Sequence, residues 1–332
     1  MEATRVSQPP PEVVVAGHIC LDIIPTFERP VTLEPGKLFK IGPAVVATGG
    51  VVSNTGIALH RLGVRTRLMG KVGDDLMGRA ILELVRPIDP DGMIVAPGAT
   101  SSYTVVISPP GVDRTFLHCT GANDTFMADD IDYDRLAGAR LFHFGYPTLM
   151  RSIYSDGGRL METIFRRVKE RGVMTSLDMS FPDPQSEAGR VDWPAWLRRV
   201  LPHVDVYLPS LDETQFMLGQ KPANELARQL HDWGAGIVGL KLGVEGLFCL
   251  WKGREYHASC FEVNVVGTTG SGDCTIAGFL AGLLRGLPPE QVMTAAVAVG
   301  ACCCEAADAT SGLRSWDEVQ RRIQAGWKRR QT

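Results

Sequence analysis

The feature that most constrains the fold of this chain is a regular alternation of short β-branched runs with amphipathic helical segments. Residues 13–19 (VVVAGHI) form a continuous apolar run, which is typical of a strand buried on both faces of a parallel sheet. A predicted helix over 55–63 and a predicted strand over 66–73 follow it. This alternation predicts a doubly wound α/β fold, with a mostly parallel sheet and helices on both faces.

The same order continues downstream. We expect further helices over 74–86, 151–171, 224–234, 273–285 and 290–307, and strands over 141–144, 173–178, 204–209 and 236–242. An antiparallel hairpin over 246–259 and a C-terminal amphipathic helix complete the predicted elements.

Two early segments do not fit this alternation. Residues 38–46 (LFKIGPAVV) read as a strand, and SSYTVVIS and RTFLHC flank a PPGVD turn within 101–119, which predicts an antiparallel hairpin. We interpret them as a small β lid that covers a site on the main sheet. The expected organisation is a core made of residues 12–36, 48–98 and 120–328, a β lid made of 37–47 and 99–119, and a disordered tail at 1–11.

Composition excludes several classes of partner. The chain has 332 residues with 34 Lys+Arg and 37 Asp+Glu, a net charge of -3, which argues against nucleic acid or an anionic membrane as a partner. The apolar stretch over 292–304 is interrupted by Thr294 and Gly300 and is too short to span a bilayer. We therefore expect a cytoplasmic protein.

The eight cysteines form no CxxC pair, and three of them are adjacent at 302–304. This spacing indicates small buried apolar residues in a reducing compartment. A zinc site is the alternative, and the missing paired ligand spacings disfavour it.

The richest segment for chemistry is VVGTTGSGDCTIAGFLAGLLRG, residues 265–286. Gly267, Gly270 and Gly272 form a turn whose free amides, together with the helix dipole, can bind an anion. Asp273 would repel phosphate if binding were its only task, so it fits a general base beside a phosphoryl group. The alternative is that Asp273 is only a helix N-cap and that the glycines only form a turn. No P-loop GxxxxGK[ST] and no early dinucleotide-binding GxGxxG occur.

Six segments in order, over roughly 13–314, resemble signatures of the ribokinase-like (PfkB) carbohydrate kinases. TTGSGDCTIAGFLAGL resembles the C-terminal signature and ATGGVVSNTGIALHRLG the N-terminal one; the others are GHICLDIIP, KVGDDLMGRAIL, LPSLDET and KLGVEG. The resemblance implies a doubly wound core with a small β lid. It also implies ATP-dependent phosphorylation of a hydroxyl of a sugar or nucleoside, with Mg²⁺ on the nucleotide phosphates, and a homodimer that assembles through the lid.

The resemblance also assigns roles to individual residues. It implies Asp273 as the catalytic base and the backbone of Gly270, Ser271 and Gly272 as the anion hole. It implies substrate contacts by Asp22, Gly49, Gly50 and Asn54, nucleotide contacts by Lys241, Gly243, Gly246 and Thr268, and orientation of metal-bound water by Glu213. Without the resemblance, Asp22 reads as a turn residue, Asn54 as an N-cap and Glu213 as a helix-start acid.

The sequence departs from the family at informative positions. Gly267 stands where an Asp usually helps to bind a monovalent cation, so we expect potassium activation to be weak or absent. Ser210 replaces the usual Asn before Glu213. No lysine follows Gly50, which disfavours a phosphorylated substrate. Gly145 stands where ribokinases place a substrate-binding Glu, which disfavours ribose.

Three functions remain open at this stage. The sequence favours an active sugar kinase over a nucleoside kinase or a ligand-binding member of the fold without turnover. The aromatic side chains expected near the site, Tyr103, Phe116 and Tyr146, suit a sugar ring or a nucleobase equally well.

Overall fold

A computed structural model describes residues 10–31, 34–110 and 114–330 of the chain. Within these residues, the main sheet has nine strands in the order β13-β12-β11-β10-β9-β8-β1-β4-β5. It is parallel from β5 to β11, and β12 and β13 add an antiparallel edge. The strands are β1 (Val13–Gly17), β4 (Thr66–Gly73), β5 (Met93–Ala96), β8 (Leu141–Gly145), β9 (Met174–Leu177), β10 (Val206–Tyr207), β11 (Ile237–Lys241), β12 (Leu247–Trp251) and β13 (Arg254–Ala258).

Two hydrophobic cores form because both faces of the main sheet are covered. Along β1, Val13 and Val15 enter one core, and Val14 and Ala16 enter the other. Such alternation follows from the two-residue period of a strand. It explains why the first strand reads as an unbroken apolar run.

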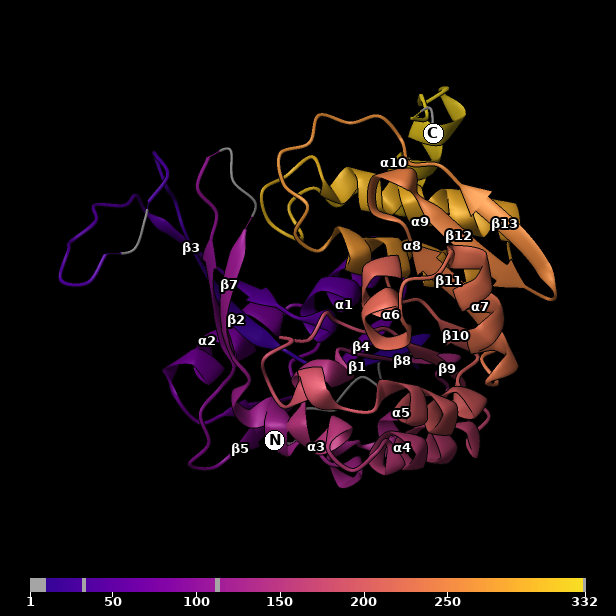
Figure 1. Cartoon of the computed structure of the whole chain (residues 1–332), viewed down its shortest axis with the longest axis horizontal. Coiled ribbons are helices and arrows are strands. Elements are labelled where there is room, and N and C mark those ends of the chain that lie inside the picture. Colours follow the sequence, from indigo (N-terminus) through magenta and orange to yellow (C-terminus); the bar gives the residue numbers. More distant parts are fainter. Residues whose placement is uncertain (1–9, 32–33, 111–113, 331–332) are drawn as a thin grey trace, which may run out of the picture.

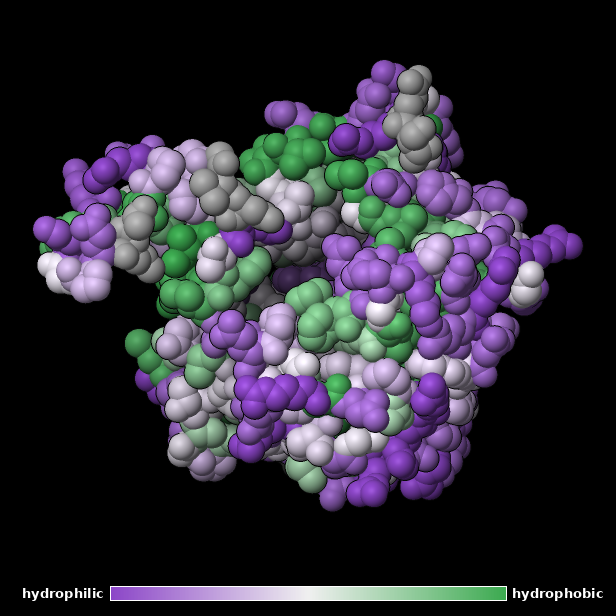
Figure 2. All heavy atoms as spheres, in the orientation of Figure 1, coloured by the Kyte–Doolittle hydropathy of each residue, from purple (hydrophilic) through white to green (hydrophobic). Residues whose placement is uncertain are grey.

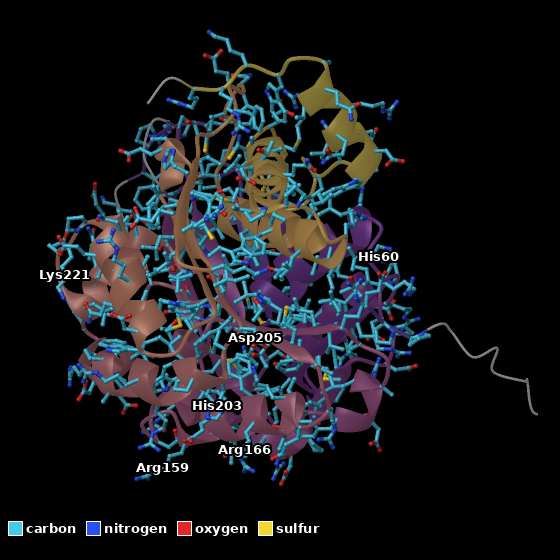
Figure 3. The ribbon with its side chains drawn as sticks, turned by 90° about the vertical axis from the view of Figure 1, so that its right-hand side faces the viewer. His60, Arg159, Arg166, His203, Asp205 and Lys221 are labelled. Carbon is cyan, nitrogen blue, oxygen red and sulfur yellow. The ribbon has the colours of Figure 1, made fainter. Side chains whose placement is uncertain are left out.

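Helices are divided between the two faces (Figure 1). One core is covered by α1 (Val51–Arg61), α2 (Leu76–Val85), α8 (Ser271–Leu284), α9 (Pro289–Cys303) and α10 (Trp316–Gln324). The other is covered by α3 (Arg151–Tyr154), α4 (Arg159–Lys169), α5 (Trp193–Val200), α6 (Leu211–Leu218) and α7 (Ala223–Asp232). The outer surface of this second layer is charged, with Arg159, Arg166 and Lys221 at its edge (Figure 3).

Close packing between α8 and α9 fixes the position of the glycine-rich segment. A Cβ on Gly278 would lie 2.8 Å from the carbonyl oxygen of Ala295, so only glycine allows this approach. A Cβ on Gly282 would likewise lie only 3.2 Å from the Cα of Val292. The small residues of this segment therefore hold the start of α8, and Asp273 with it, against the rest of the core.

A second sheet has four strands among the described residues, in the order β3-β2-β6-β7. They are β2 (Cys20–Pro25), β3 (Ala44–Gly49), β6 (Tyr103–Ile107) and β7 (Thr115–Cys119). The β2–β3 and β6–β7 pairs are antiparallel and β2–β6 is parallel. This small sheet forms a lid that projects from one side of the core (Figure 1).

The predicted α/β architecture and the lid are confirmed, with differences in detail. Strand β5 and helix α5 were not expected from the sequence. The strand expected over 38–46 begins only at Ala44, and residues 38–43 have no regular structure. The single helix expected over 151–171 is split into α3 and α4, because Gly157 and Gly158 adopt positive φ between them. Strand β2, within the segment 12–36 expected in the core, pairs in the small sheet.

Some expectations lie outside the described residues. These include positions 1–9 of the expected disordered tail and positions 111–113 of the expected turn. None of the helices in the described part of the chain combines the length and apolar character that a membrane span requires.

Candidate active site

A cavity of about 930 Å³ lies between the small sheet and the carboxyl ends of the central parallel strands. His18 follows β1 and Tyr146 follows β8, while Asp22 and Phe116 come from β2 and β7. The space-filling view shows this face hollowed beside the small sheet (Figure 2). Ligands of open α/β sheets bind at this edge, where loops leave the strands.

Asp273 lies at the inner end of this cavity and is 3% exposed. Its carboxylate accepts hydrogen bonds from Asn54 Nδ2 at 2.9 Å and from the Tyr146 hydroxyl at 2.8 Å, with Thr55 Oγ1 at 3.4 Å. Burial raises the pKa of Asp273, and the bonds from Asn54 and Tyr146 oppose that rise. A buried carboxylate with a raised pKa, open to a cavity, is suited to take a proton from a bound hydroxyl.

The N-cap interpretations of Asp273 and Asn54 are wrong. Gly270 is the N-cap of α8, and Asp273 is the third residue of that helix. Gly50 is the N-cap of α1, and Asn54 lies one turn further along. Both side chains point instead toward each other across the interface between the two helices.

The start of α8 has the geometry of an anion site. Gly270 has a φ of 73°, and a Cβ there would lie 2.4 Å from Cβ of Ala309. The amide of Ser271 is bonded to the Thr268 carbonyl at 3.2 Å. The next two amides, of Gly272 and Asp273, belong to the first helical turn and have no intrahelical acceptor. They can bind a phosphoryl oxygen with the help of the helix dipole.

Lys241 lies beside this helix start. Its Nζ lies 3.5 Å from the position that a Cβ on Gly272 would take, and it forms an ion pair with Asp178 at 2.8 Å. Burial lowers the pKa of Lys241, but the carboxylates of Asp178 and Glu213, with Asp273, together outweigh burial and raise the pKa. The ammonium group is therefore a fixed positive charge near the expected phosphate position.

Glu213 belongs to the same charged group but has a structural task as well. Its carboxylate accepts from the amide of Ser210 at 2.7 Å, and Ser210 Oγ accepts from the amide of Glu213 at 3.2 Å. This capping box begins α6. Burial raises the pKa of Glu213, and the Lys241 ammonium opposes the rise. Ser210 thus caps the helix at the position where the family usually has Asn.

Asp22 occupies the lid side of the cavity, on β2. A Cβ on Gly49 would lie 2.2 Å from Asp22 Oδ2, so glycine is required for the neighbouring strand to pass this carboxylate. Burial raises the pKa of Asp22, while bonds from Cys20 and Thr104 oppose the rise. Asp22 is one of the residues that line the cavity.

The lid also contacts the glycine-rich turn directly. Arg114, just before β7, donates to Thr268 Oγ1 at 2.7 Å and to Thr269 Oγ1. Gly243 and Gly246, in contrast, shape the turn between β11 and β12 with φ of 58° and 107°. These two glycines lie beyond the residues that line the cavity.

Gly267 is required by its own surroundings. A Cβ there would lie 2.9 Å from the Ala306 carbonyl oxygen and 3.0 Å from that of Ala307. The carboxylate of Asp308 accepts from the amides of Thr310 at 2.8 Å and Ser311 at 2.7 Å, and so closes its own turn. A larger residue at position 267 would collide with this loop.

Two residues near the expected base were not assigned from the sequence. Tyr146 was expected only as an aromatic surface for the substrate, whereas its hydroxyl contacts both oxygens of Asp273. Asp178 was not singled out. The signal for both is their position, because each directly follows a parallel strand whose carboxyl end meets the cavity.

Comparisons with known proteins agree with this architecture. The chain is 29% identical over 276 residues to a 2-dehydro-3-deoxygluconokinase of Thermoproteus tenax, covering 81% of this chain and 83% of the relative. It is 31% identical over 259 residues to an uncharacterized sugar kinase of Archaeoglobus fulgidus, covering 77% and 98%. A crystal structure of a putative ribokinase II from E. coli, in complex with ATP and Mg²⁺, aligns with a TM-score of 0.78 at 21% identity, covering 95% and 99%.

The family model described as pfkB family carbohydrate kinase matches residues 10–316. This match spans the main sheet, the lid and the glycine-rich turn. The chain is therefore a carbohydrate kinase of the PfkB family, with the ribokinase-like fold.

Proposed function

We propose that the chain transfers the γ-phosphoryl group of ATP to a hydroxyl of a neutral sugar, with Asp273 as the general base. The observation that carries this proposal is the position of Asp273, buried at the inner end of the cavity and beside the free amides of α8. Family membership supplies the reaction class. The geometry supplies the expected roles of individual groups.

The nucleotide side fits a polyphosphate. Bound Mg–ATP would supply the phosphoryl group and neutralise part of its charge. The amides of Gly272 and Asp273 would hold phosphoryl oxygens, and Lys241 would contribute a positive charge at the same place. Glu213 interacts electrostatically with Lys241, and the family resemblance implies that it orients metal-bound water.

The sugar side provides the base and a hydroxyl acceptor. Asp22 would accept hydrogen bonds from sugar hydroxyls and so fix the ring. Asp273 would take the proton of the attacking hydroxyl, while Asn54 and Tyr146 hold its carboxylate in place. General-base catalysis by Asp273 and positioning of the attacking hydroxyl by Asp22 are the two contributions to the rate that these residues would make.

A neutral sugar is favoured because the positive groups of the cavity are already engaged. Arg151 is paired with Glu187 at 3.0 Å, and Arg114 binds Thr268 and Thr269. Burial lowers the pKa of His18, with the neighbouring imidazole adding to the effect, so its ring is neutral near pH 7. A substrate carboxylate or phosphate would therefore compete with these existing partners, whereas a neutral sugar would not.

The test is release of ADP with purified protein and Mg–ATP over a matched panel of acceptors. We expect a neutral ketose or aldose to give the highest kcat/KM. A higher value for a 2-keto-3-deoxy sugar acid would contradict the neutral-sugar proposal, and a higher value for a nucleoside would favour the nucleoside kinase. No acceptor-dependent ADP release at all would favour a ligand-binding protein.

A further inference from the structure

We propose that His18, Cys20 and His118 form a binding site for a zinc-like divalent transition metal at the lid side of the cavity. One ligand atom from each of these residues lies within 4.8 Å of the other two. All three residues line the cavity, so an ion could enter without opening the core. The spacing of the cysteines in the sequence disfavours a zinc site made of paired cysteines. The fold instead brings two histidines and one cysteine together.

The distances suit a tetrahedral ion. His18 Nε2 and His118 Nε2 are 3.2 Å apart. Two nitrogens bound to one tetrahedral zinc at about 2.0–2.1 Å would be roughly 3.3–3.4 Å apart. The distance between the two imidazole nitrogens is therefore close to the one that a tetrahedral ion requires, and the Cys20 thiol supplies the third ligand type that zinc, but not Mg²⁺, prefers. Three protein ligands would leave the fourth position open toward the cavity.

Neighbouring groups orient the ligands. Thr104 Oγ1 lies 3.0 Å from His118 Nδ1 and 3.5 Å from Cys20 Sγ, so one hydroxyl contacts two of the three. Strand register sets this arrangement, because Thr104 pairs with His118 on β7 and with Asp22 on β2. Support of the distal nitrogen by a hydrogen bond is the usual arrangement around a histidine that binds metal.

The second nitrogen of His18 shows that this ring is not a fully satisfied structural histidine. Its Nδ1 is buried and has no hydrogen-bond partner among the described residues. Buried polar atoms without a partner are uncommon and call for a specific reason. His18 therefore lacks the distal support that Thr104 gives to His118, and a bound ion would have to hold this ring through Nε2 alone.

Metal binding would release the Cys20 thiol proton to water and form a metal–thiolate bond, without oxidation or reduction. Cys20 Sγ lies 3.3 Å from Asp22 Oδ1, so the ion would sit next to the carboxylate assigned to sugar hydroxyls. The metal should then compete with the sugar and not with ATP. This consequence rests on the proposed function, whereas the site itself does not.

The direct test uses Co²⁺ added to metal-free full-length protein, followed by absorption. We expect one equivalent to bind with tetrahedral d–d bands and a thiolate charge-transfer band. Cys20→Ser should abolish the charge-transfer band, and His118→Gln should weaken binding by at least about 10-fold. Cys119→Ser is the matched control, because Cys119 neighbours His118 on β7 but its side chain points to the opposite face.

The outcomes separate the site from the proposed function. A thiolate band that persists in Cys20→Ser, or that is lost in Cys119→Ser while thermal unfolding is unchanged, would overturn the site. In kinase assays at buffered free Zn²⁺, inhibition should be competitive with sugar in the wild type and in Cys119→Ser, and at least about 10-fold weaker in His118→Gln. Inhibition competitive with ATP would overturn the competition with sugar. A Co²⁺ site in a protein without acceptor-dependent activity would refute the proposed function alone.

Discussion

Replacing Asp273 by Asn should remove most of the turnover while leaving the fold intact. The amide cannot take the proton of the sugar hydroxyl, and loss of a general base costs on the order of 10²–10⁴-fold in kcat. That range corresponds to about 2.7–5.4 kcal/mol in the activation free energy. We expect the Kd for ATP to stay nearly constant, because the α8 amides that would hold the phosphates are unchanged.

The structure indicates that an asparagine side chain can be accommodated in place of Asp273. Asn54 Nδ2 donates to the carboxylate at 2.9 Å, and the other end of the same amide, Asn54 Oδ1, is buried without a partner among the described residues. Rotation of the Asn54 amide would offer that oxygen to the amide group introduced by the substitution. The substitution also removes a buried charge near Asp178 and Glu213. We therefore expect little change in the free energy of unfolding.

The assay is ADP release with the best acceptor from the panel, with ATP affinity by calorimetry and thermal unfolding as controls. A variant that is folded, binds ATP normally and has lost at least about 100-fold in kcat would support the assignment. Retention of more than half of the wild-type turnover would refute the role of Asp273 as base. A large loss of thermal stability would refute the account of how Asn54 adapts.

Three further outcomes follow from the site. Asp22→Ala should raise the KM for sugar far more than that for ATP, by about 10- to 150-fold, since a hydrogen bond to a charged group contributes roughly 1.5–3 kcal/mol; equal changes in both values would contradict a sugar-binding role. Tyr146→Phe removes a bond that lowers the pKa of Asp273, so the acidic limb of the kcat/KM–pH profile should move to higher pH, and an unmoved limb would argue against that contact. Kinase activity in potassium chloride should be close to that in a bulky organic cation at equal ionic strength, because Gly267 packs against the carbonyls of 306–307 and supplies no carboxylate to bind a cation. Strong, saturable activation by potassium would mean that another group binds the ion.

The sequence by itself determined the architecture, because that information is local and periodic. The apolar run at the first strand, the alternation after it and the small residues of α8 each reflect which faces are buried. The glycine-rich turn before Asp273 likewise marks an anion site from one short segment. Each of these signals lies within one segment of about twenty residues, so it can be recognised without knowing the rest of the fold.

The sequence was less informative where pairing is set by distant partners. Strand β2 continues directly from the first strand in the chain, and only its pairing with β3 and β6 shows that it belongs to the lid. The helix expected over 151–171 is interrupted by Gly157 and Gly158, and the second of these packs against Val200 and Trp196. Strand and helix limits depend on such contacts, which a local pattern does not contain.

Contacts within the site were decided by the tertiary structure alone. Asn54 and Asp273 are 219 residues apart, yet they share a hydrogen bond because α1 and α8 pack on the same face of the sheet. His18 and His118 are 100 residues apart and meet because the lid folds back over the end of β1. Side chains that act together in a cavity need no sequence spacing in common. Their proximity comes from the long-range order of strands and helices, which only the folded chain supplies.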